Sequence, residues 1–379
     1  MIDRVVISGG GTGGHIFPAI AIADEIKNRN PKVKILFVGA AGKMEMEKVP
    51  QAGYKIEGLR IAGFQRKFTW SNFLLPFKII KSLLKARRIL TQFKPQLVIG
   101  VGGYASGPTL KMANLLGIPT LIQEQNSYPG KTNRMLARRA ENICVAYDKM
   151  DQFFPKKKII LTGNPVRKEF HVKQDLRADA FNYYKLDPTK PVLLVIGGSL
   201  GAKTLNRSLA RNIETINKAG IQVIWQTGSH YYSDLVEELF REEMKNIHLL
   251  QFINRMDLAY AAADVIISRA GAISVSELCM VGKPIVLVPS PNVSDDHQTK
   301  NALSLVEKGA AILVKDGEAR EKLVKKTLDL IKDTKRCQEI SAALKQLEKP
   351  NATIEIVDVC EGIVARTAKP KSKHKSKSK

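Results

Sequence analysis

The stretch "ISGGGTGGHIFPAIAIADEI", residues 7–26, joins a short apolar segment to an amphipathic one through five glycines. The segment that leads into it, "RVVIS" (4–8), is β-branched and apolar, which is typical of a buried strand. The segment that follows has apolar side chains at helical spacing, namely Ile16, Ala19, Ile20, Ala23 and Ile26. The sequence therefore predicts a strand, a glycine-rich loop and a helix.

The glycines at 9, 11 and 14 satisfy the spacing G-x-G-x-x-G. Such a loop lets backbone N–H groups approach a diphosphate at a helix N-terminus, and the alternative is a tight turn without a ligand. A nicotinamide dinucleotide would also require an acid roughly 20 residues further on, at the end of the second strand. That strand, "VKILFVGA" (33–40), ends in Gly39 and Ala40. The pattern therefore favours a diphosphate site without that ribose contact.

Composition indicates a large, basic, folded protein. The chain has 379 residues, of which 44% are hydrophobic, enough for two α/β domains. The formal net charge is +24, and +18 remains without the six lysines of "KPKSKHKSKSK" (369–379). Basic surfaces attract nucleic acids, anionic lipids or phosphorylated substrates. The low aromatic content and the absence of an RNP-like motif or C2H2 spacing argue against a nucleic-acid partner.

The four cysteines indicate neither zinc nor disulfides, because they lie far apart and form no C-x-x-C pair. We expect them to be buried, inert thiols. The first predicted strand begins at residue 4, which leaves no room for a signal peptide. No apolar run approaches the roughly 18 residues of a membrane span. These features predict a cytoplasmic protein, peripheral to the cytoplasmic face of the plasma (inner) membrane if it binds lipid.

The chain repeats its opening pattern in the second half. "PVLLVI" (191–196) is followed by "GGSLGAKTLNRSLARNI" (197–213), again a strand, a glycine-rich turn and a helix. Strands alternate with helices in both halves, which predicts two doubly wound, Rossmann-like parallel-sheet domains facing across a cleft, with ligands at the carboxyl ends of the strands. We expect an N-terminal domain, a C-terminal domain, a terminal helix that packs back on the N-terminal domain, and a disordered basic tail. Their predicted ranges are 1–163, 164–345, 346–368 and 369–379.

"GGSLG" (197–201) also fits G-x-S-x-G, the nucleophile elbow of α/β hydrolases. Ser199 would then be the nucleophile, with a histidine from among His230, His248 and His297. A hydrolase elbow belongs to one large sheet, however, and not to the start of a second repeat. The pattern favours phosphate binding by Ser199 over nucleophilic catalysis.

The stretch 268–302 contains a third candidate site. Ser274 or Ser276 is predicted to cap a helix, with Glu277 in the first turn, where its carboxylate can accept both hydroxyls of a ribose. Together with the other motifs, this stretch resembles the MurG family of N-acetylglucosaminyltransferases of peptidoglycan synthesis. The matching motifs, in family order, are "GGGTGGH" (9–15), "GVGGYASGP" (100–108), "EQNSYPGKTNR" (124–134), "TGNPVR" (162–167), "GGSLGA" (197–202), "SRAGAISVSE" (268–277) and "DDHQTKNA" (295–302). Gln123 departs from the histidine that the family often has there.

The resemblance implies a GT-B fold and inverting transfer of GlcNAc from UDP-GlcNAc to the C4 hydroxyl of the muramoyl sugar of lipid I, giving lipid II and UDP. It implies that Ile253 reads uracil through its backbone, that Glu277 holds the ribose and that Gln298 binds GlcNAc hydroxyls. The residues implied to contact the donor are Thr12, Gly13, Gly14, Asn126, Arg167, Ser199, Ile253, Ala272, Ile273, Ser274, Val275, Ser276, Glu277 and Gln298. The acceptor diphosphate would face Gly102, Gly103 and Tyr104.

Inversion requires a base at the acceptor hydroxyl and stabilisation of the leaving diphosphate. The chain has no D-x-D pair, so we expect neither a metal nor another cofactor. Arg167, Ser199 and helix N-termini can stabilise the diphosphate instead. His15 is the first candidate for the base, and a structural role in fixing the glycine loop is its alternative. Glu124 is the weaker candidate.

Residues 73–88 form a candidate membrane surface. "FLLPF" (73–77) precedes a stripe of cations at helical spacing, Lys78, Lys81, Lys85 and Arg88. Apolar insertion beside cations suits an anionic bilayer. In the alternative, an ordinary amphipathic helix, Ile80 and Leu84 would face the core. The remaining functional alternatives are a related GT-B transferase with another UDP-sugar or acceptor, and a non-catalytic membrane scaffold.

Overall fold

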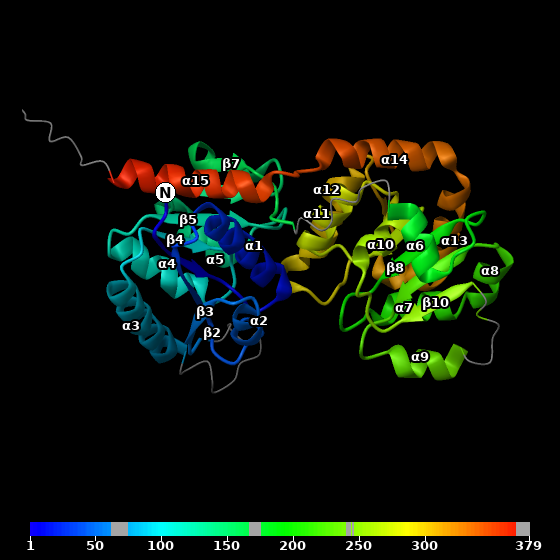
Figure 1. The fold of residues 1–379 in the computed structure, drawn as a ribbon, viewed down its shortest axis with the longest axis horizontal. Coiled ribbons are helices and arrows are strands. Elements are labelled where there is room, and N and C mark those ends of the chain that lie inside the picture. Colours follow the sequence, from blue (N-terminus) through cyan, green and yellow to red (C-terminus); the bar gives the residue numbers. More distant parts are fainter. Residues whose placement is uncertain (62–74, 167–175, 240–243, 245, 369–379) are drawn as a thin grey trace, which may run out of the picture. The chain divides into compact units, whose positions relative to one another are not determined.

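The computed structural model describes residues 1–61, 75–166, 176–239, 244 and 246–368. The chain separates into two compact units (Figure 1). Unit 1 comprises Met1–Pro165 and Asn351–Lys379, and unit 2 comprises Val166–Pro350. Each unit is built on one parallel sheet with helices on its faces, which is the predicted pair of doubly wound domains.

Unit 1 has a seven-stranded sheet in the order β3-β2-β1-β4-β5-β6-β7, with all strand pairs parallel. The strands are β1 (Arg4–Ser8), β2 (Lys34–Ala40), β3 (Lys55–Leu59), β4 (Leu97–Gly100), β5 (Thr120–Glu124), β6 (Asn142–Val145) and β7 (Ile159–Leu161). The chain winds outward from β1 in one direction and from β4 in the other. The point between β1 and β4 is therefore the topological switch point, where open α/β sheets bind ligands.

Alternating side chains of β1 divide the core of unit 1 into two layers, as the pleat of a strand requires. Val5 and Ile7 pack in one cluster with α1 (Gly13–Arg29) and with α15 (Ala352–Ala368). Val6 packs on the opposite face in a second cluster with α3 (Leu75–Phe93) and α4 (Ser106–Leu115). The other helices of this unit are α2 (Glu45–Gln51) and α5 (Lys131–Leu136).

Helix α15 returns to unit 1 after the chain has completed unit 2, and it packs against α1. Arg29 of α1 donates to Asp358 Oδ1 (2.6 Å), Glu361 Oε2 (3.0 Å) and the Ile354 carbonyl (3.1 Å). These bonds lie beside a buried apolar seam that includes Ile356 and Cys360. The helix begins at Ala352, whereas residues 346 and 347 are the end of α14.

Unit 2 has a six-stranded parallel sheet in the order β10-β9-β8-β11-β12-β13. The strands are β8 (Val192–Ile196), β9 (Gln222–Gln226), β10 (Ile247–Leu250), β11 (Val265–Ser268), β12 (Ile285–Leu287) and β13 (Ile312–Leu313). The helices are α6 (Leu176–Tyr184), α7 (Lys203–Ala210), α8 (Ile213–Lys218), α9 (Tyr232–Leu239), α10 (Met256–Ala262), α11 (Ala272–Val281), α12 (His297–Val306), α13 (Ala319–Lys332) and α14 (Thr334–Leu347). The switch point lies between β8 and β11.

Candidate functional site

Two glycine-rich loops meet at the switch point of unit 1. The loop after β1 contains Gly10, and the loop after β4 contains Gly103. Gly103 has φ +85°, and a Cβ built on it would lie 2.3 Å from the Gly10 carbonyl oxygen. Only glycine permits this backbone conformation together with so close an approach. The glycines therefore bring the loops of two paired strands into direct backbone contact.

A buried carboxylate that sequence reasoning missed fixes the first loop. Glu45, the first residue of α2, is 1% exposed. Its Oε2 accepts from the Gly11 amide (2.8 Å), and its Oε1 accepts from the Ala40 amide (2.9 Å). The acid sought at the end of β2 thus lies five residues beyond Ala40, and it binds the glycine loop. The available signal was an acid in the first turn of a predicted helix, a position that helices commonly favour.

His15 lies in the first turn of α1 and not in the loop before it, because the helix begins at Gly13. Its Nδ1 is 3.4 Å from Thr12 Oγ1, a long contact. Its Nε2 would lie 2.7 Å from a Cβ built on Gly102, so the imidazole packs directly over that glycine. The structure therefore brings Thr12, His15 and Gly102 together at the end of β1 and β4.

Glu124 ends β5 and organises the following loop. Its Oε1 accepts from the Asn126 amide (3.0 Å) and side chain (3.3 Å). Its Oε2 accepts from the Gly130 amide (3.1 Å) and from Asn133 Nδ2 (2.9 Å). Four donors on one buried carboxylate are typical of a group that holds a loop in place.

Gln123, the departure from the family pattern, is buried beside this loop. Its Nε2 donates to Asn164 Oδ1 (2.9 Å), and Asn164 in turn donates to the Gln125 carbonyl (3.0 Å). The side chain therefore ties the end of β5 to Asn164, near the end of the first segment of unit 1. Tyr104, which follows Gly103, is exposed at this edge.

In unit 2, the predicted donor residues follow the carboxyl ends of four strands of the one parallel sheet. Ser199 follows β8, Ile253 follows β10, the run 272–277 follows β11, and Gln298 follows β12. Because the strands are parallel, these ends lie on one edge of the sheet. The Ile253 side chain is buried, so that only its backbone can face a ligand.

The helix that carries Glu277 begins earlier than predicted. Gly271 is the N-cap of α11, so Ser274 and Ser276 are interior residues and Glu277 lies in the second turn. Ser276 Oγ donates to the Ala272 carbonyl (3.1 Å) instead of capping the helix. Val275 points into the core, whereas Ala272, Ile273 and Glu277 are half-buried. The N-terminal amides of α11 remain directed toward the carboxyl edge, where an anion is favoured.

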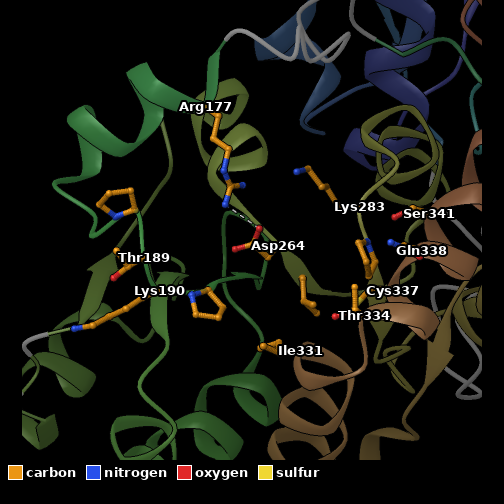
Figure 2. Close-up of a pocket in the computed structure, with 14 residues that line it drawn as sticks. Arg177, Thr189, Lys190, Asp264, Lys283, Ile331, Thr334, Cys337, Gln338 and Ser341 are labelled. Carbon is orange, nitrogen blue, oxygen red and sulfur yellow. Dashed lines mark hydrogen bonds and ion pairs between the residues drawn. The ribbon is translucent and has the colours of Figure 1, made fainter.

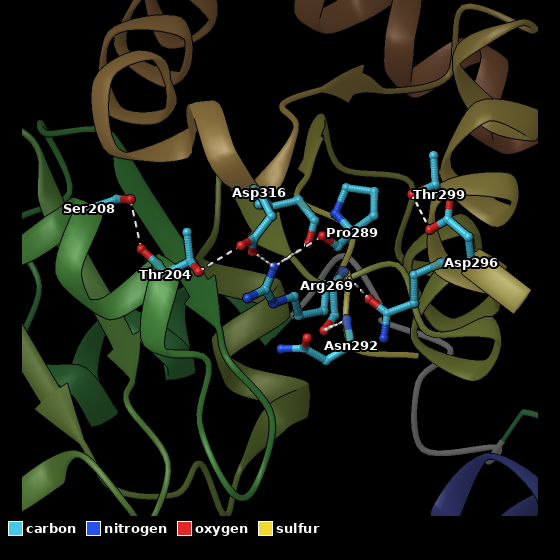
Figure 3. A network of polar contacts seen from close by, with 11 residues as sticks. Thr204, Ser208, Arg269, Pro289, Asn292, Asp296, Thr299 and Asp316 are labelled. Carbon is cyan, nitrogen blue, oxygen red and sulfur yellow. Dashed lines mark hydrogen bonds and ion pairs between the residues drawn. The ribbon is translucent and has the colours of Figure 1, made fainter. Parts of the chain in front are cut away.

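An arginine–aspartate pair joins the loops of this edge, and sequence reasoning missed it (Figure 3). Arg269, directly after β11, forms an ion pair with Asp316, and their side chains are 16% and 19% exposed. Arg269 Nη1 also donates to the Val288 carbonyl after β12 (2.9 Å), and Thr204 Oγ1 of α7 donates to Asp316 Oδ2 (2.9 Å). The pair thus links the segments that follow β8, β11 and β12.

The start of α12 fixes Gln298. Asp295 and Asp296 both have positive φ, 52° and 53°, in a conformation that short polar side chains tolerate best. Thr299 Oγ1 donates to Asp296 Oδ1 (2.7 Å; Figure 3), and Gln298 Oε1 accepts from the Ser290 amide (2.8 Å). Gln298 is therefore held against the loop after β12.

The geometry around Ser199 does not form a hydrolase site. Within the described part of the chain, Ser199 Oγ makes no hydrogen bond to a histidine. The positive φ angles of its turn belong to Gly198 and Gly201 and not to the serine, so the strained backbone of a nucleophile elbow is missing. Arg167, the other predicted diphosphate ligand, lies outside the described residues. A search of those residues finds no group of three His, Cys, Asp or Glu that could hold a metal ion.

Comparison with known proteins gives a consistent result for both units. The glycosyltransferase family 28 N-terminal domain matches residues 5–145, and the C-terminal domain of that family matches residues 192–356. A relative from Flavobacterium psychrophilum is 53% identical over 94% of this chain and 96% of its own length. Another, from Cytophaga hutchinsonii, is 54% identical over 94% and 95%. Both are named UDP-N-acetylglucosamine–N-acetylmuramyl-(pentapeptide) pyrophosphoryl-undecaprenol N-acetylglucosamine transferase.

A solved structure agrees with these relatives. The crystal structure of MurG from Acinetobacter baumannii is 31% identical, with a TM-score of 0.78 over 95% of this chain and 99% of its own. The predicted GT-B architecture is therefore confirmed. At more than half identity over nearly the full length of the named relatives, the chain belongs to the MurG family of N-acetylglucosamine transferases.

Proposed function

We propose that this chain transfers N-acetylglucosamine from UDP-GlcNAc to the C4 hydroxyl of the muramoyl sugar of undecaprenyl-diphospho-muramoyl-pentapeptide (lipid I). The products are lipid II and UDP. The observation that carries the proposal is the identity of more than 50% to transferases whose names specify this donor and acceptor. The extent of the match also supports the proposal, because the two domain models of the family cover both units of the chain.

The carboxyl edge of unit 2 suits the uridine diphosphate part of the donor. The amino end of α11 and the turn containing Ser199 supply N–H and hydroxyl donors for the diphosphate. Glu277 supplies a carboxylate for the ribose, the Ile253 backbone contacts the base, and Gln298 contacts the sugar. Arg269 and Asp316 orient the loops that carry these groups and need not touch the ligand.

The carboxyl edge of unit 1 suits the acceptor and the proton transfer. The C4 oxygen attacks the anomeric carbon while the bond to the diphosphate oxygen breaks, and the hydroxyl proton passes to a base. We assign the base to His15, whose imidazole packs over Gly102. Glu124 already accepts four hydrogen bonds, so its oxygens serve the loop that begins at Asn126. The donor contacts expected of Thr12, Gly13, Gly14 and Asn126 belong to the same edge.

Helix α3 suits peripheral binding to an anionic bilayer on the cytoplasmic face. Ile80 and Leu84, expected on the core face in the alternative interpretation, are 54% and 59% exposed. Lys81, Lys85 and Arg88 are exposed on the same helix, so apolar and cationic groups share one surface. Phe73 and Leu74 lie outside the described residues. Within the described part of the chain, no helix has the length and apolar character needed to span a membrane.

The reaction itself tests the proposal. Purified full-length protein is incubated with a short-chain lipid I analogue and either UDP-GlcNAc, UDP-glucose or UDP-GalNAc, and UDP release and product mass are followed. We expect UDP-GlcNAc to give equimolar UDP and the disaccharide lipid, in preference to the other donors. Preferred use of another UDP-sugar would identify a different transferase, and free GlcNAc in place of the disaccharide would identify a hydrolase.

A further inference from the structure

A second hollow lies at the opposite, amino edge of the unit 2 sheet (Figure 2). Pro191, Asp264 and Pro284 line it, and each directly precedes a strand, β8, β11 and β12 respectively. Its volume is about 510 Å³, within the range of roughly 300–1,000 Å³ that is typical of small-molecule sites. An adjoining hollow of about 840 Å³ shares Lys283 with it.

This hollow is separate from the donor site. The four residues of β11 divide the two edges, which is about 13 Å at 3.3 Å per residue. The donor loops follow Ser268, whereas the hollow is lined by Asp264 and by side chains of α14. A ligand here would contact none of the residues assigned to the transfer reaction.

One of the cations that line the two hollows, Lys283, has no acidic partner in the part of the chain that the structure describes. Arg177 pairs with Asp264 (2.9 Å), Lys190 with Asp187 (3.6 Å) and Lys345 with Glu348 (3.9 Å). Asp264 Oδ2 also accepts from the Val192 amide (2.8 Å), so that carboxylate is fully used. Lys283 has no ion pair or hydrogen bond among the residues that the structure describes. An anion in the hollow would supply its missing partner.

Lys283 is held in place by its backbone neighbours. Gly282, in the left-handed conformation (φ +67°), ends α11, and Pro284 restricts the next peptide before β12. The side chain is half-buried. Burial, together with the neighbouring Arg177 guanidinium, lowers the pKa of Lys283, and Asp264 only partly opposes this effect. A partly desolvated ammonium gains more from a charged partner than an exposed one does.

We propose that this hollow binds a small, soluble, phosphate-bearing molecule, with Lys283 as its principal anion ligand. Gln338 and Ser341 of α14 supply further polar groups, and Figure 2 shows Lys283 between them and the Arg177–Asp264 pair. The apolar wall, which includes Val265, Pro284 and Ile331, accommodates the uncharged part of the ligand. A nucleotide-sized molecule fits the volume.

Cys337 provides a local readout, because it also lines the hollow. The other three cysteines, Cys144, Cys279 and Cys360, are buried, whereas Cys337 is half-buried. The rate of Cys337 alkylation by N-ethylmaleimide is measured by mass spectrometry on the full-length protein with saturating UDP, at one fixed pH. The probes are inorganic phosphate, inorganic pyrophosphate and, as a separate arm, phosphatidylglycerol vesicles.

We expect phosphate or pyrophosphate to slow alkylation about tenfold at about ten times its Kd, because only the unoccupied tenth of the molecules reacts. Lys283→Met and Gln338→Glu should abolish this protection, the second by adding a repelling charge without removing the lysine. The matched control Lys325→Met changes an exposed lysine of α13 and should keep the protection. UDP binding confirms that each variant is folded.

Several results would overturn the proposal. One is equal protection in Lys283→Met and wild type. Another is protection by vesicles alone, which would indicate a lipid headgroup. A third is loss of thermal stability in Lys283→Met with no protection by either anion in the wild type. In that case Lys283 would only complement the C-terminus of α11.

Discussion

The carboxyl edges of the two sheets are built on the same topology but are held by opposite chemistry. In unit 1, two buried carboxylates, Glu45 and Glu124, accept hydrogen bonds from loop amides. In unit 2, the Arg269–Asp316 ion pair links the loops through side chains and carbonyls. The Gly11 amide of unit 1 is thus bound to an acid, whereas the N-cap of α11 in unit 2 is Gly271, which has no side chain that could cap the helix.

We propose that this difference decides where a nucleotide diphosphate binds. In unit 1, Glu45 already accepts from the Gly11 amide of the first glycine loop, so that amide is not available to the diphosphate of UDP. The edge of unit 2 has the amino end of α11 and an acid, Glu277, which we assign to the ribose. Glycine-rich strand-to-helix turns therefore do not by themselves identify the nucleotide site, because the side chains that occupy their amides decide it.

The largest effect on stability and UDP binding is expected from Arg269→Met, which removes the ion pair that joins the unit 2 loops. Removing one partner of a partly buried ion pair leaves Asp316 without its counter-charge, and the cost should be below the roughly 3–5 kcal/mol that breaking a fully buried pair takes from the free energy of unfolding. We expect a lower melting temperature and strongly weakened UDP binding by calorimetry. The matched control Arg336→Met removes an exposed pair with Glu339 and should cost about 1 kcal/mol or less. Unchanged UDP affinity in Arg269→Met would remove the pair from the organisation of the donor edge.

Glu45→Gln tests the other edge and should have a smaller effect. The amide keeps one oxygen acceptor but turns an N–H group toward a backbone donor, which costs about 1–3 kcal/mol. We expect slower transfer to the lipid acceptor with an unchanged Kd for UDP. Glu47→Gln, at an exposed position of the same helix, is the control. If Glu45→Gln weakened UDP binding as much as Arg269→Met does, the division of the two edges would be wrong.

Membrane binding should also distinguish the two units, because we assign the membrane surface to α3 of unit 1 alone. In Ile80→Ser/Leu84→Ser, two partly exposed apolar side chains are lost, so vesicle affinity should fall by about 1–2 kcal/mol, roughly tenfold. Co-sedimentation with anionic vesicles at several salt concentrations measures this, using protein without residues 369–379. Ile354→Ser on α15 is the control. Undiminished binding of the double variant would exclude α3, and loss on tail deletion alone would assign the role to the lysine tail.

Removal of divalent metals should have the smallest effect. The sequence contains no D-x-D pair, and we assign stabilisation of the leaving diphosphate to protein groups. Turnover with UDP-GlcNAc and the lipid I analogue should therefore be the same with and without EDTA. Loss of turnover that Mn²⁺ or Mg²⁺ restores would show that unit 2 needs a metal at its carboxyl edge.

Local sequence patterns predicted most of the strands and helices, but few of the side-chain contacts that fix the loops between them. The alternation around "RVVIS" and "PVLLVI" predicted both first strands, and parallel order then placed Ser199, Ile253 and Gln298 on one edge. Arg269 and Asp316 are 47 positions apart, so no local pattern could pair them. Gly271, and not a serine, caps α11, because the turn after β11 ends three residues before Ser274, the nearer of the two predicted caps.

The orientation of α3 has a similar explanation. Periodicity predicted an amphipathic α3 but could not fix which of its stripes faces the sheet. Ser82, Ala86, Ile89 and Leu90 are buried, and Ile80 and Leu84 are exposed. Small residues at 82 and 86 let the helix approach the sheet closely, an effect that depends on tertiary packing. Three of the four cysteines are buried as expected, whereas Cys337 is half-buried.

Hydrogen exchange in the presence of UDP directly tests the assignment of the nucleotide to unit 2. Amide exchange is measured by mass spectrometry on the full-length protein with and without saturating UDP. We predict slower exchange in peptides that cover 197–202, 252–254 and 271–277, and unchanged exchange in those that cover 101–107, the loop that we assign to the acceptor. Protection of that unit 1 loop without protection of the unit 2 loops would contradict the assignment.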